Sequence, residues 1–186
     1  MTTNCPLDQR PLATNGTQEL STVNLRAIEP EDLDLLYRIE NDTALWNIGT
    51  SNVPYSRYLL HDYVAHATAD IYTDRQARLM VDNAEGQTVG IADLVSFDPS
   101  NRRAEVGLII LNEYRHQGYA TSALQQLCDY ARRVLHLHQL YAYVDVHNEA
   151  SLALFRKAGF SAAVRMPDWL CDGDSYHDAW LMQRLF

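Results

Sequence analysis

The feature that most restricts the fold is a run of three segments in which apolar and polar residues alternate. They cover residues 77–82, 88–96 and 103–111, and only the short turns NAEG and DPSN separate them. An alternation of period two places one face of a strand on a core, and short turns join strands that are antiparallel neighbours. The sequence therefore predicts an antiparallel meander of three strands.

A helical pattern follows at residues 119–135, where apolar residues recur at steps of three and four. Similar signals predict helices at about 30–40, 56–67 and 149–158, and strands at about 23–28, 139–146, 160–164 and 175–184. The order β-α-α-β-β-β-α-β-α-β-β indicates mixed α/β layers rather than a doubly wound sheet. Residues 1–20 are polar and aperiodic, so we expect a mobile tail there and a single domain over residues 21–186.

Composition excludes several classes of function. A formal charge of −9 argues against nucleic-acid partners, because their recognition usually needs a basic face. The three cysteines are far apart and contain no CxxC pair, which predicts neither a disulfide scaffold nor a zinc site. His61 and His66 are five residues apart without a completing carboxylate, so no metal is expected. The sequence contains neither a targeting signal nor an apolar run of about 20 residues, which predicts a cytoplasmic protein without a membrane partner.

The stretch NEYRHQGYATSAL, residues 112–124, joins the third strand of the meander to the long helix. A helix that begins near Gly118 presents unpaired backbone N–H groups, and its dipole favours an anion at that end. Arg115 adds a permanent charge, while Gln117 and Thr121 add neutral donors. A pyrophosphate would suit such a site. The alternative is a strand-to-helix turn that uses glycine for its geometry alone.

Two motifs resemble those of a known family. Arg115-x-x-Gly118-x-Ala120 is similar to the acetyl-CoA pyrophosphate loop, Q/R-x-x-G-x-G/A, of the GNAT superfamily of N-acetyltransferases. Residues 147–160, HNEASLALFRKAGF, resemble the second signature of that family, at the separation and in the element order that it shows. Within the superfamily, the sequence is similar to bacterial spermidine N-acetyltransferases and to ribosomal-protein N-terminal acetyltransferases.

The resemblance implies a central mixed, mostly antiparallel sheet with splayed middle strands, flanked by about four helices. It also implies acetyl-CoA as co-substrate, with the pantetheine arm in the gap between the splayed strands. A backbone N–H of Ile110 or Leu111 would polarise the thioester carbonyl. For Asn148, a helix N-cap is an alternative role that does not exclude contact with the pantetheine. The expected acetyl-CoA contacts are Ile109, Ile110, Leu111, Arg115, His116, Gln117, Gly118, Tyr119, Ala120, Thr121 and Asn148.

The reaction implied by the family is direct attack of a neutral amine on the thioester. Alkylammonium groups titrate near pH 10, so a base must remove a proton first, and Glu105 is the candidate. A cross-strand pair of Glu105 with Arg102 or Arg103 is the alternative interpretation. Many family members protonate the departing thiolate with a tyrosine at the position where this sequence has Phe155. Tyr119, Tyr114 or solvent would then have to supply the proton.

The acceptor is expected to bind near the first two helices, where acidic residues outnumber basic ones. Acids and aromatic residues there suit a small cationic amine such as a polyamine. The candidate substrate-binding residues are Glu40, Asp42, Trp46, Tyr55 and Asp62. The alternatives are an acetyltransferase of a protein or peptide N-terminus and a non-catalytic acyl-CoA-binding sensor. A homo-oligomer is an expectation from the family.

Overall fold

The computed structural model describes residues 21–43, 53–67 and 70–186. The predicted tail therefore lies outside the described residues, as does Trp46. The first half of the described chain contains β1 (Val23–Ala27), the 3-10 helix η1 (Pro30–Asp32), α1 (Leu33–Glu40), α2 (Arg57–His66) and α3 (Ile71–Asp74). Ser56 caps α2, because its side chain accepts the N–H of Leu59.

The predicted meander is present as β2 (Ala77–Asn83), β3 (Thr88–Asp98) and β4 (Arg103–Ile110). The 3-10 helix η2 (Asn112–Tyr114) follows and leads to α4 (Tyr119–Arg133). The chain then forms β5 (Gln139–Asp145), α5 (Glu149–Lys157), β6 (Ser161–Asp172) and β7 (Ser175–Leu185). The mixed α/β fold class and the order of the predicted elements are confirmed.

Two elements differ from the prediction. The single turn α3, which Asp70 caps, was not predicted, so the described residues contain five α-helices rather than four. Strand β6 continues to Asp172 instead of ending at residue 164. Its pairing with β7 shifts register between Ala162 and Val164 and again between Met166 and Leu170. Each shift inserts unpaired residues, which breaks the alternation that identifies a strand in the sequence.

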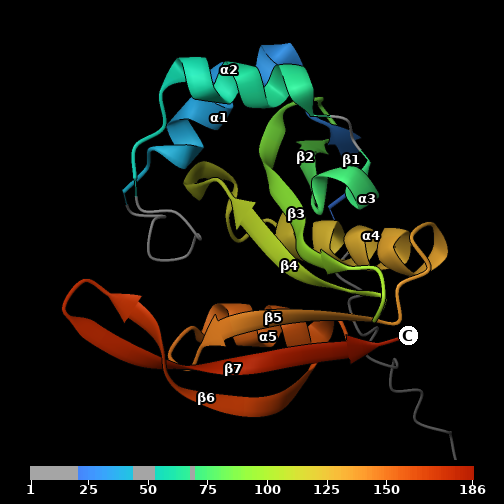
Figure 1. Cartoon of the computed structure of the whole chain (residues 1–186), viewed down its shortest axis with the longest axis vertical. Helices are drawn as coiled ribbons and strands as arrows, with labels where there is room; N and C mark the ends of the chain where they lie inside the picture. The colour runs from blue at the N-terminus through green and yellow to red at the C-terminus, as the bar shows by residue number, and fades with distance from the viewer. Residues whose placement is uncertain (1–20, 44–52, 68–69) are drawn as a thin grey trace, which may run out of the picture.

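All seven strands form one sheet in the order β1-β2-β3-β4-β5-β7-β6. Every neighbouring pair is antiparallel except β4 and β5, which are parallel and pair only over three residues of β4, from Arg103 to Glu105. Beyond Glu105 the two strands separate, as Figure 1 shows in the middle of the molecule. The predicted splay of the middle strands is thus present, while β3 and β4 stay in continuous register from Glu105 to Ile110.

The sheet carries a hydrophobic core on each face. On one face, α4 and α5 bury residues such as Leu124, Leu127 and Phe155 against the sheet. On the other face, a smaller core joins Leu36 and Leu60 of the first two helices to Met80 and Ile91 of the sheet. Figure 1 shows α1 and α2 over the β2–β4 end, so the β5–β7 end extends beyond them.

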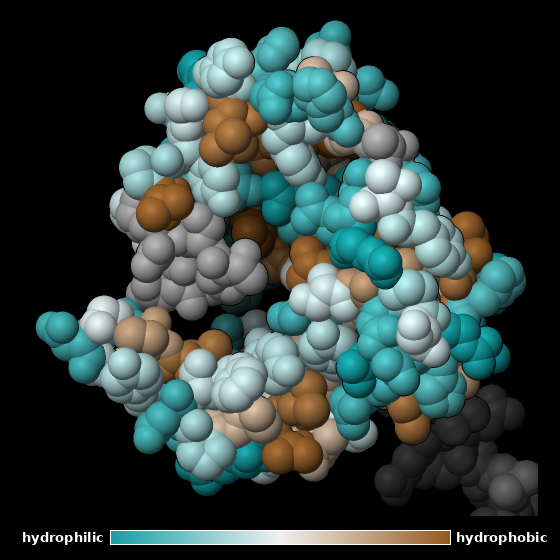
Figure 2. Space-filling model, in the orientation of Figure 1, coloured by the Kyte–Doolittle hydropathy of each residue, from teal (hydrophilic) through white to brown (hydrophobic). Residues whose placement is uncertain are grey.

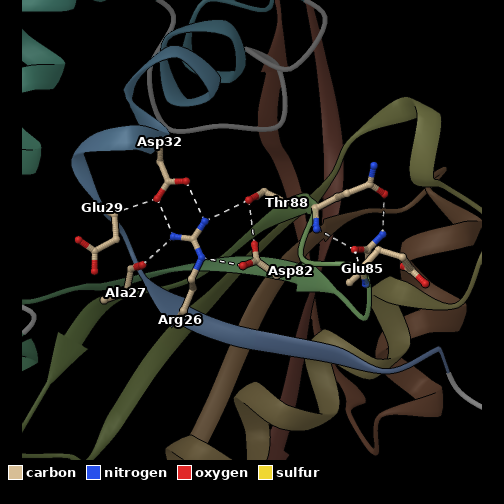
Figure 3. Close-up of polar contacts among 9 residues, drawn as sticks. Arg26, Ala27, Glu29, Asp32, Asp82, Glu85 and Thr88 are labelled. Carbon is tan, nitrogen blue, oxygen red and sulfur yellow. Dashed lines mark hydrogen bonds and ion pairs between the residues drawn. The ribbon is translucent and has the colours of Figure 1, made fainter.

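A buried ion pair fixes the start of the first helical layer to the sheet (Figure 3). The guanidinium of Arg26 in β1 donates two hydrogen bonds to Asp32, at 2.7 and 2.8 Å, and a third to Asp82 of β2 at 2.7 Å. Burial raises the pKa of Asp32, but the bonds from Arg26 and from the N–H of Glu29 outweigh burial and lower it overall. The network therefore ties β1 and η1, which are neighbours in the sequence, to the distant strand β2.

Candidate active site

The separation of β4 and β5 opens a cleft of about 830 Å³ that passes through the sheet. Its walls come from both strands, from α1, α2 and α5, and from the β6–β7 hairpin. In Figure 2 the surface is hollowed between the part formed by the first helices and the part formed by β5–β7. A second pocket of about 450 Å³ shares Ile39 and Ile109 with the cleft and extends to Arg115. The two hollows meet at the end of β4.

The end of β4 presents one backbone donor toward the gap. The N–H of Leu111 donates to the carbonyl of Val89 in β3 at 2.9 Å, so it is not directed at the cleft. Because successive backbone groups of a strand point in opposite directions, the N–H and C=O of Ile110 face the β5 side. Of the two predicted oxyanion donors, Ile110 is the one whose geometry fits.

Gly118 shapes the loop between β4 and α4. Its φ of +86° lies in the left-handed region, which allows the chain to turn directly into the helix. The first turn of α4 leaves the amides of Tyr119 and Ala120 outside the helical bonding pattern, as an anion site requires. The Nε atom of Arg115 donates to the carbonyl of Ile110 at 3.1 Å and so joins the loop to the strand end. The loop therefore has the backbone geometry that the predicted anion site requires, and the site itself stays a prediction.

We expect Gly118→Val to raise the KM for acetyl-CoA about tenfold or more, with a smaller effect on kcat. A side chain costs about 1–2 kcal/mol in the left-handed region, so the backbone of the loop is strained although the new Cβ would lie at an ordinary 3.4 Å from Ser21 Oγ. Steady-state kinetics at varied acetyl-CoA measures this effect. The matched control is Gly86→Val, which has a φ of +75° in the β2–β3 turn. Equal KM values for the two variants would contradict the assigned role of the loop.

Glu105 lies where β4 and β5 begin to separate, and its half-buried side chain lines the cleft. Burial raises its pKa, and a hydrogen bond of 3.4 Å from Ser96 Oγ partly opposes that shift. Arg103 forms an ion pair with Asp98 at 3.2 Å, so the alternative pairing of Glu105 with this arginine is wrong. A half-buried carboxylate with a raised pKa is suited to accept a proton near neutral pH.

The predicted proton donor, Tyr119, is not among the residues that line the cleft. Its ring packs edge-on against Tyr114, with 6.3 Å between ring centroids, and Tyr114 does not line the cleft either. Phe155 does line it, and the Asn148 cap of α5 lies there too, with its side chain accepting the N–H of Ser151 at 3.0 Å. The structure therefore gives Asn148 the N-cap position and a place in the cleft together.

The loop residues and the cleft residues separate into two groups. Ile109 and Asn148 line the main cleft, and Ile109, Ile110, Leu111 and Arg115 line the second pocket. The remaining predicted acetyl-CoA contacts lie on the loop and the first turn of α4, outside the lining of both pockets: His116, Gln117, Gly118, Tyr119, Ala120 and Thr121. This division suits a ligand with an elongated arm and a separate phosphate group.

Four of the five predicted acceptor residues lie in the described part of the chain. Glu40 and Tyr55 line the main cleft, and Asp42 lines the second pocket. Asp62 does not line either pocket, because it lies on the exposed side of α2 and pairs with His66 at 3.2 Å.

Arg78 is a cleft residue that sequence reasoning missed. It donates two hydrogen bonds to Asp93, at 3.0 and 2.9 Å, pairs with Glu40, and lies over the ring of Tyr63. The pairing register sets Arg78 of β2 directly opposite Asp93 of β3. Arg78 and Asp93 lie on two predicted strands that adjoin. With the register known, this pattern would have predicted the cross-strand ion pair.

Comparisons with known proteins agree with this geometry. Residues 22–161 match the family model described as Acetyltransferase (GNAT) domain. The chain is 33% identical to the spermidine N(1)-acetyltransferase of Escherichia coli strain K12 over 144 residues, which are 75% of this chain and 73% of that protein. It is 29% identical over 163 residues to a Bacillus subtilis protein provisionally named a ribosomal N-acetyltransferase, with 84% of this chain and 87% of that protein covered.

A solved structure has the same fold over most of the chain. The spermidine N-acetyltransferase of Vibrio cholerae, crystallised with CoA and spermine, gives a TM-score of 0.78 at 25% identity, with 88% of this chain and 95% of that chain covered. Fold and cleft together thus define an enzyme that transfers an acetyl group from a CoA thioester. The chain belongs to the GNAT family, and it is an acetyl-CoA-dependent N-acetyltransferase. The family resemblance inferred from the two motifs is confirmed.

Two further observations concern ions and membranes. Within residues 21–43, 53–67 and 70–186, no three or more His, Cys, Asp or Glu side chains come together as a metal site would require. No helix in the same ranges has the length and apolar character needed to cross a bilayer.

Proposed function

We propose that the acceptor of this enzyme is a polyamine or a similarly cationic small amine. The observation that carries the proposal is the charge of the cleft. Among its described lining residues, Arg78 is the permanent cation, and the carboxylates are Glu40, Asp93, Glu105, Asp145 and Asp172. A cleft with low-dielectric walls concentrates this negative potential and attracts cations.

Aromatic rings beside the cleft support the same substrate class. Tyr143 lines the cleft, and its ring lies 5.8 Å from the Tyr141 ring and 5.2 Å from the Trp169 ring. Rings of this kind attract ammonium groups through their π faces and contact the methylene segments between them. The Escherichia coli and Vibrio cholerae relatives reported above are named spermidine acetyltransferases, and a polyamine is the same class of molecule, which supports the proposal.

The proposed mechanism assigns each step to a described group. The loop at residues 115–121 binds the pyrophosphate, and the parted edge of β4 binds the pantetheine arm by backbone pairing. Glu105 accepts a proton from the acceptor ammonium, directly or through water, and the neutral amine attacks the thioester carbonyl. The N–H of Ile110 stabilises the oxyanion that forms.

A second candidate acceptor is the N-terminus of a protein or peptide. The similarity to the Bacillus subtilis protein and to an N-alpha-acetyltransferase of Sulfurisphaera tokodaii, 26% identical over 161 residues, favours it. A cytoplasmic location and a homo-oligomeric state stay predictions from the sequence.

Release of CoA thiol from acetyl-CoA, followed with each acceptor in turn, tests the proposal. We expect spermidine and spermine to have a higher kcat/KM than butylamine, because only the polyamines carry several charges, and we expect that advantage to shrink in high salt. The panel also contains an aminoglycoside and peptides with free N-termini. Turnover of a peptide without turnover of any polyamine would transfer the proposal to the second candidate.

A further inference from the structure

The group that protonates the departing sulfur is missing from the position where the family motif leads one to expect it. Phe155 cannot donate a proton, and its ring packs edge-on against Phe160 with 5.0 Å between centroids. The predicted substitutes, Tyr114 and Tyr119, lie outside the lining of the cleft. A donor must therefore come from another wall of the cleft or from water.

An aspartate–histidine pair stands in that cleft. His177 of β7 and Asp145 at the end of β5 both line it, and Nδ1 of His177 lies 3.1 Å from Oδ2 of Asp145. The other carboxylate oxygen, Oδ1, accepts the backbone N–H of His147 at 2.7 Å, which fixes the carboxylate in the turn before α5. Both side chains are about two-thirds buried, with 31% of His177 and 28% of Asp145 exposed. The imidazole is thus oriented through Nδ1, and Nε2 is left for a ligand.

We propose that His177 is the proton donor to the CoA sulfur and that Asp145 is its positioning residue. An imidazole held at one nitrogen by a carboxylate and delivering a proton from the other is a recurring solution in acyl transfer. The pair supplies the proton donor that Phe155 cannot provide, and it lines the same cleft. This inference rests on the proposed direct attack on acetyl-CoA, and it does not depend on which amine is the acceptor.

The step balances in atoms and charge. The amine nitrogen forms a bond to the carbonyl carbon, the tetrahedral intermediate collapses, and the C–S bond breaks with its electron pair on sulfur. His177 enters this step as the imidazolium, with its Nδ1–H donated to Asp145, and the proton on Nε2 moves to that sulfur and gives the CoA thiol. The acceptor ammonium loses two protons: one through Glu105 before the attack, and one from the nitrogen of the tetrahedral intermediate. Both reach water. Water returns one proton to His177, so the reaction releases one proton in all.

Other proton-bearing side chains in the described lining of the cleft fit the role less well. Burial raises the pKa of Tyr63, and its hydroxyl already accepts a hydrogen bond from Gln76 at 3.3 Å. The thiol of Cys171 donates to the carbonyl of Gly173 at 3.4 Å. The His147 ring is exposed and packs against His177, with 6.1 Å between centroids. Tyr55 and Tyr143, which also line the cleft, remain as the competitors that an experiment must separate from His177.

The first test compares His177→Gln and Asp145→Asn with the wild-type enzyme. We expect each variant to lower kcat about tenfold to a hundredfold. This is the low end of the effect of a general acid, because a thiolate leaves readily. The KM for acetyl-CoA should stay within about twofold of the wild-type value. The double variant should lose no more than either single variant, because the pair acts as a unit. Thermal melting of each variant identifies any that fail to fold.

The second test restores a donor at the motif position. Phe155→Tyr in the His177→Gln background is expected to recover about tenfold or more of the lost kcat, which a purely structural role of His177 would not allow. The matched control is His138→Gln, an exposed histidine outside the cleft, which should leave kcat unchanged. A kcat of His177→Gln within about twofold of wild type would overturn the proposal. A larger loss in Tyr55→Phe, Tyr143→Phe or His147→Gln than in His177→Gln would overturn it too.

The two proposals fail in different ways. The C–S bond breaks whatever the acceptor, so the His177 comparison uses any acceptor of the panel that the wild-type enzyme turns over, including water in the slow hydrolysis of acetyl-CoA. If no polyamine is acetylated, the proposed function is wrong and the His177 comparison continues with the active acceptor. If polyamines are acetylated equally by wild type and His177→Gln, only the inference about His177 is wrong.

Discussion

Replacing Glu105 by glutamine is expected to lower kcat/KM about a hundredfold to a thousandfold. The amide keeps the size of the side chain but cannot accept the proton of the acceptor ammonium. Because burial raises the pKa of Glu105, its ionised form is lost as the pH falls through that raised pKa, at a higher pH than for an ordinary glutamate. The wild-type profile of kcat/KM against pH should therefore show a limb that rises with pH, and this limb should disappear in Glu105→Gln.

Ser96→Ala refines that experiment. The Ser96 hydroxyl stabilises the ionised form of Glu105, so its removal should raise the pKa further and move the rising limb to higher pH, while the activity at alkaline pH is retained. Glu85→Gln, on the exposed turn between β2 and β3 and outside the lining of both pockets, is the matched control for loss of a carboxylate. If Glu105→Gln stays within about threefold of wild type across the pH range, Glu105 is not the base.

Replacing Arg78 by methionine is expected to lower the free energy of unfolding by about 3 kcal/mol. The guanidinium compensates Asp93 and Glu40, whose side chains are 15% and 21% exposed, and methionine would leave the two carboxylates facing each other without it. The value is at the low end for buried pairs, because 24% of the Arg78 side chain is exposed and water screens it in part. Urea unfolding curves give the change directly.

The matched control is Arg57→Met, which removes an arginine from an exposed pair with Asp34 at the surface. Exposed pairs contribute about 0–1 kcal/mol, so this variant should unfold close to the wild-type midpoint. A similar loss of stability in both variants would show that Arg78 contributes no more than a surface charge. A triple variant with Glu40→Gln and Asp93→Asn should recover part of the loss, because no uncompensated charge remains.

The sequence predicted the elements of the fold well because their signals are local. The three alternating segments became β2, β3 and β4, and the helical period at residues 119–135 became α4 within two residues at its end. Strand β6 was predicted too short because its register shifts depend on pairing with β7. The single turn α3 contains too few residues for a period to be visible.

The candidate site divides in the same way. The Gly118 turn and the Asn148 cap could be predicted because one backbone conformation or one capping side chain defines each. The ion pairs of Arg78 and the contact of His177 with Asp145 join residues 15 or more positions apart. Only the strand order and register bring these side chains together, so no local sequence pattern predicts their contacts. The direction of the Leu111 amide likewise depends on which strand lies beside it.

The short pairing between β4 and β5 has a mechanical consequence. Because only residues from Arg103 to Glu105 join the strands, the sheet consists of two blades, β1–β4 and β5–β7, connected along the sheet at one end. The pantetheine arm of acetyl-CoA, lying in the gap, would pair with the strand edges like an eighth strand and hold the two blades together. Loss of the acetyl group changes little of that arm, so CoA would hold the two blades together almost as firmly as acetyl-CoA does. Dissociation of the thiol product would then require the two blades to separate, as binding of the thioester does.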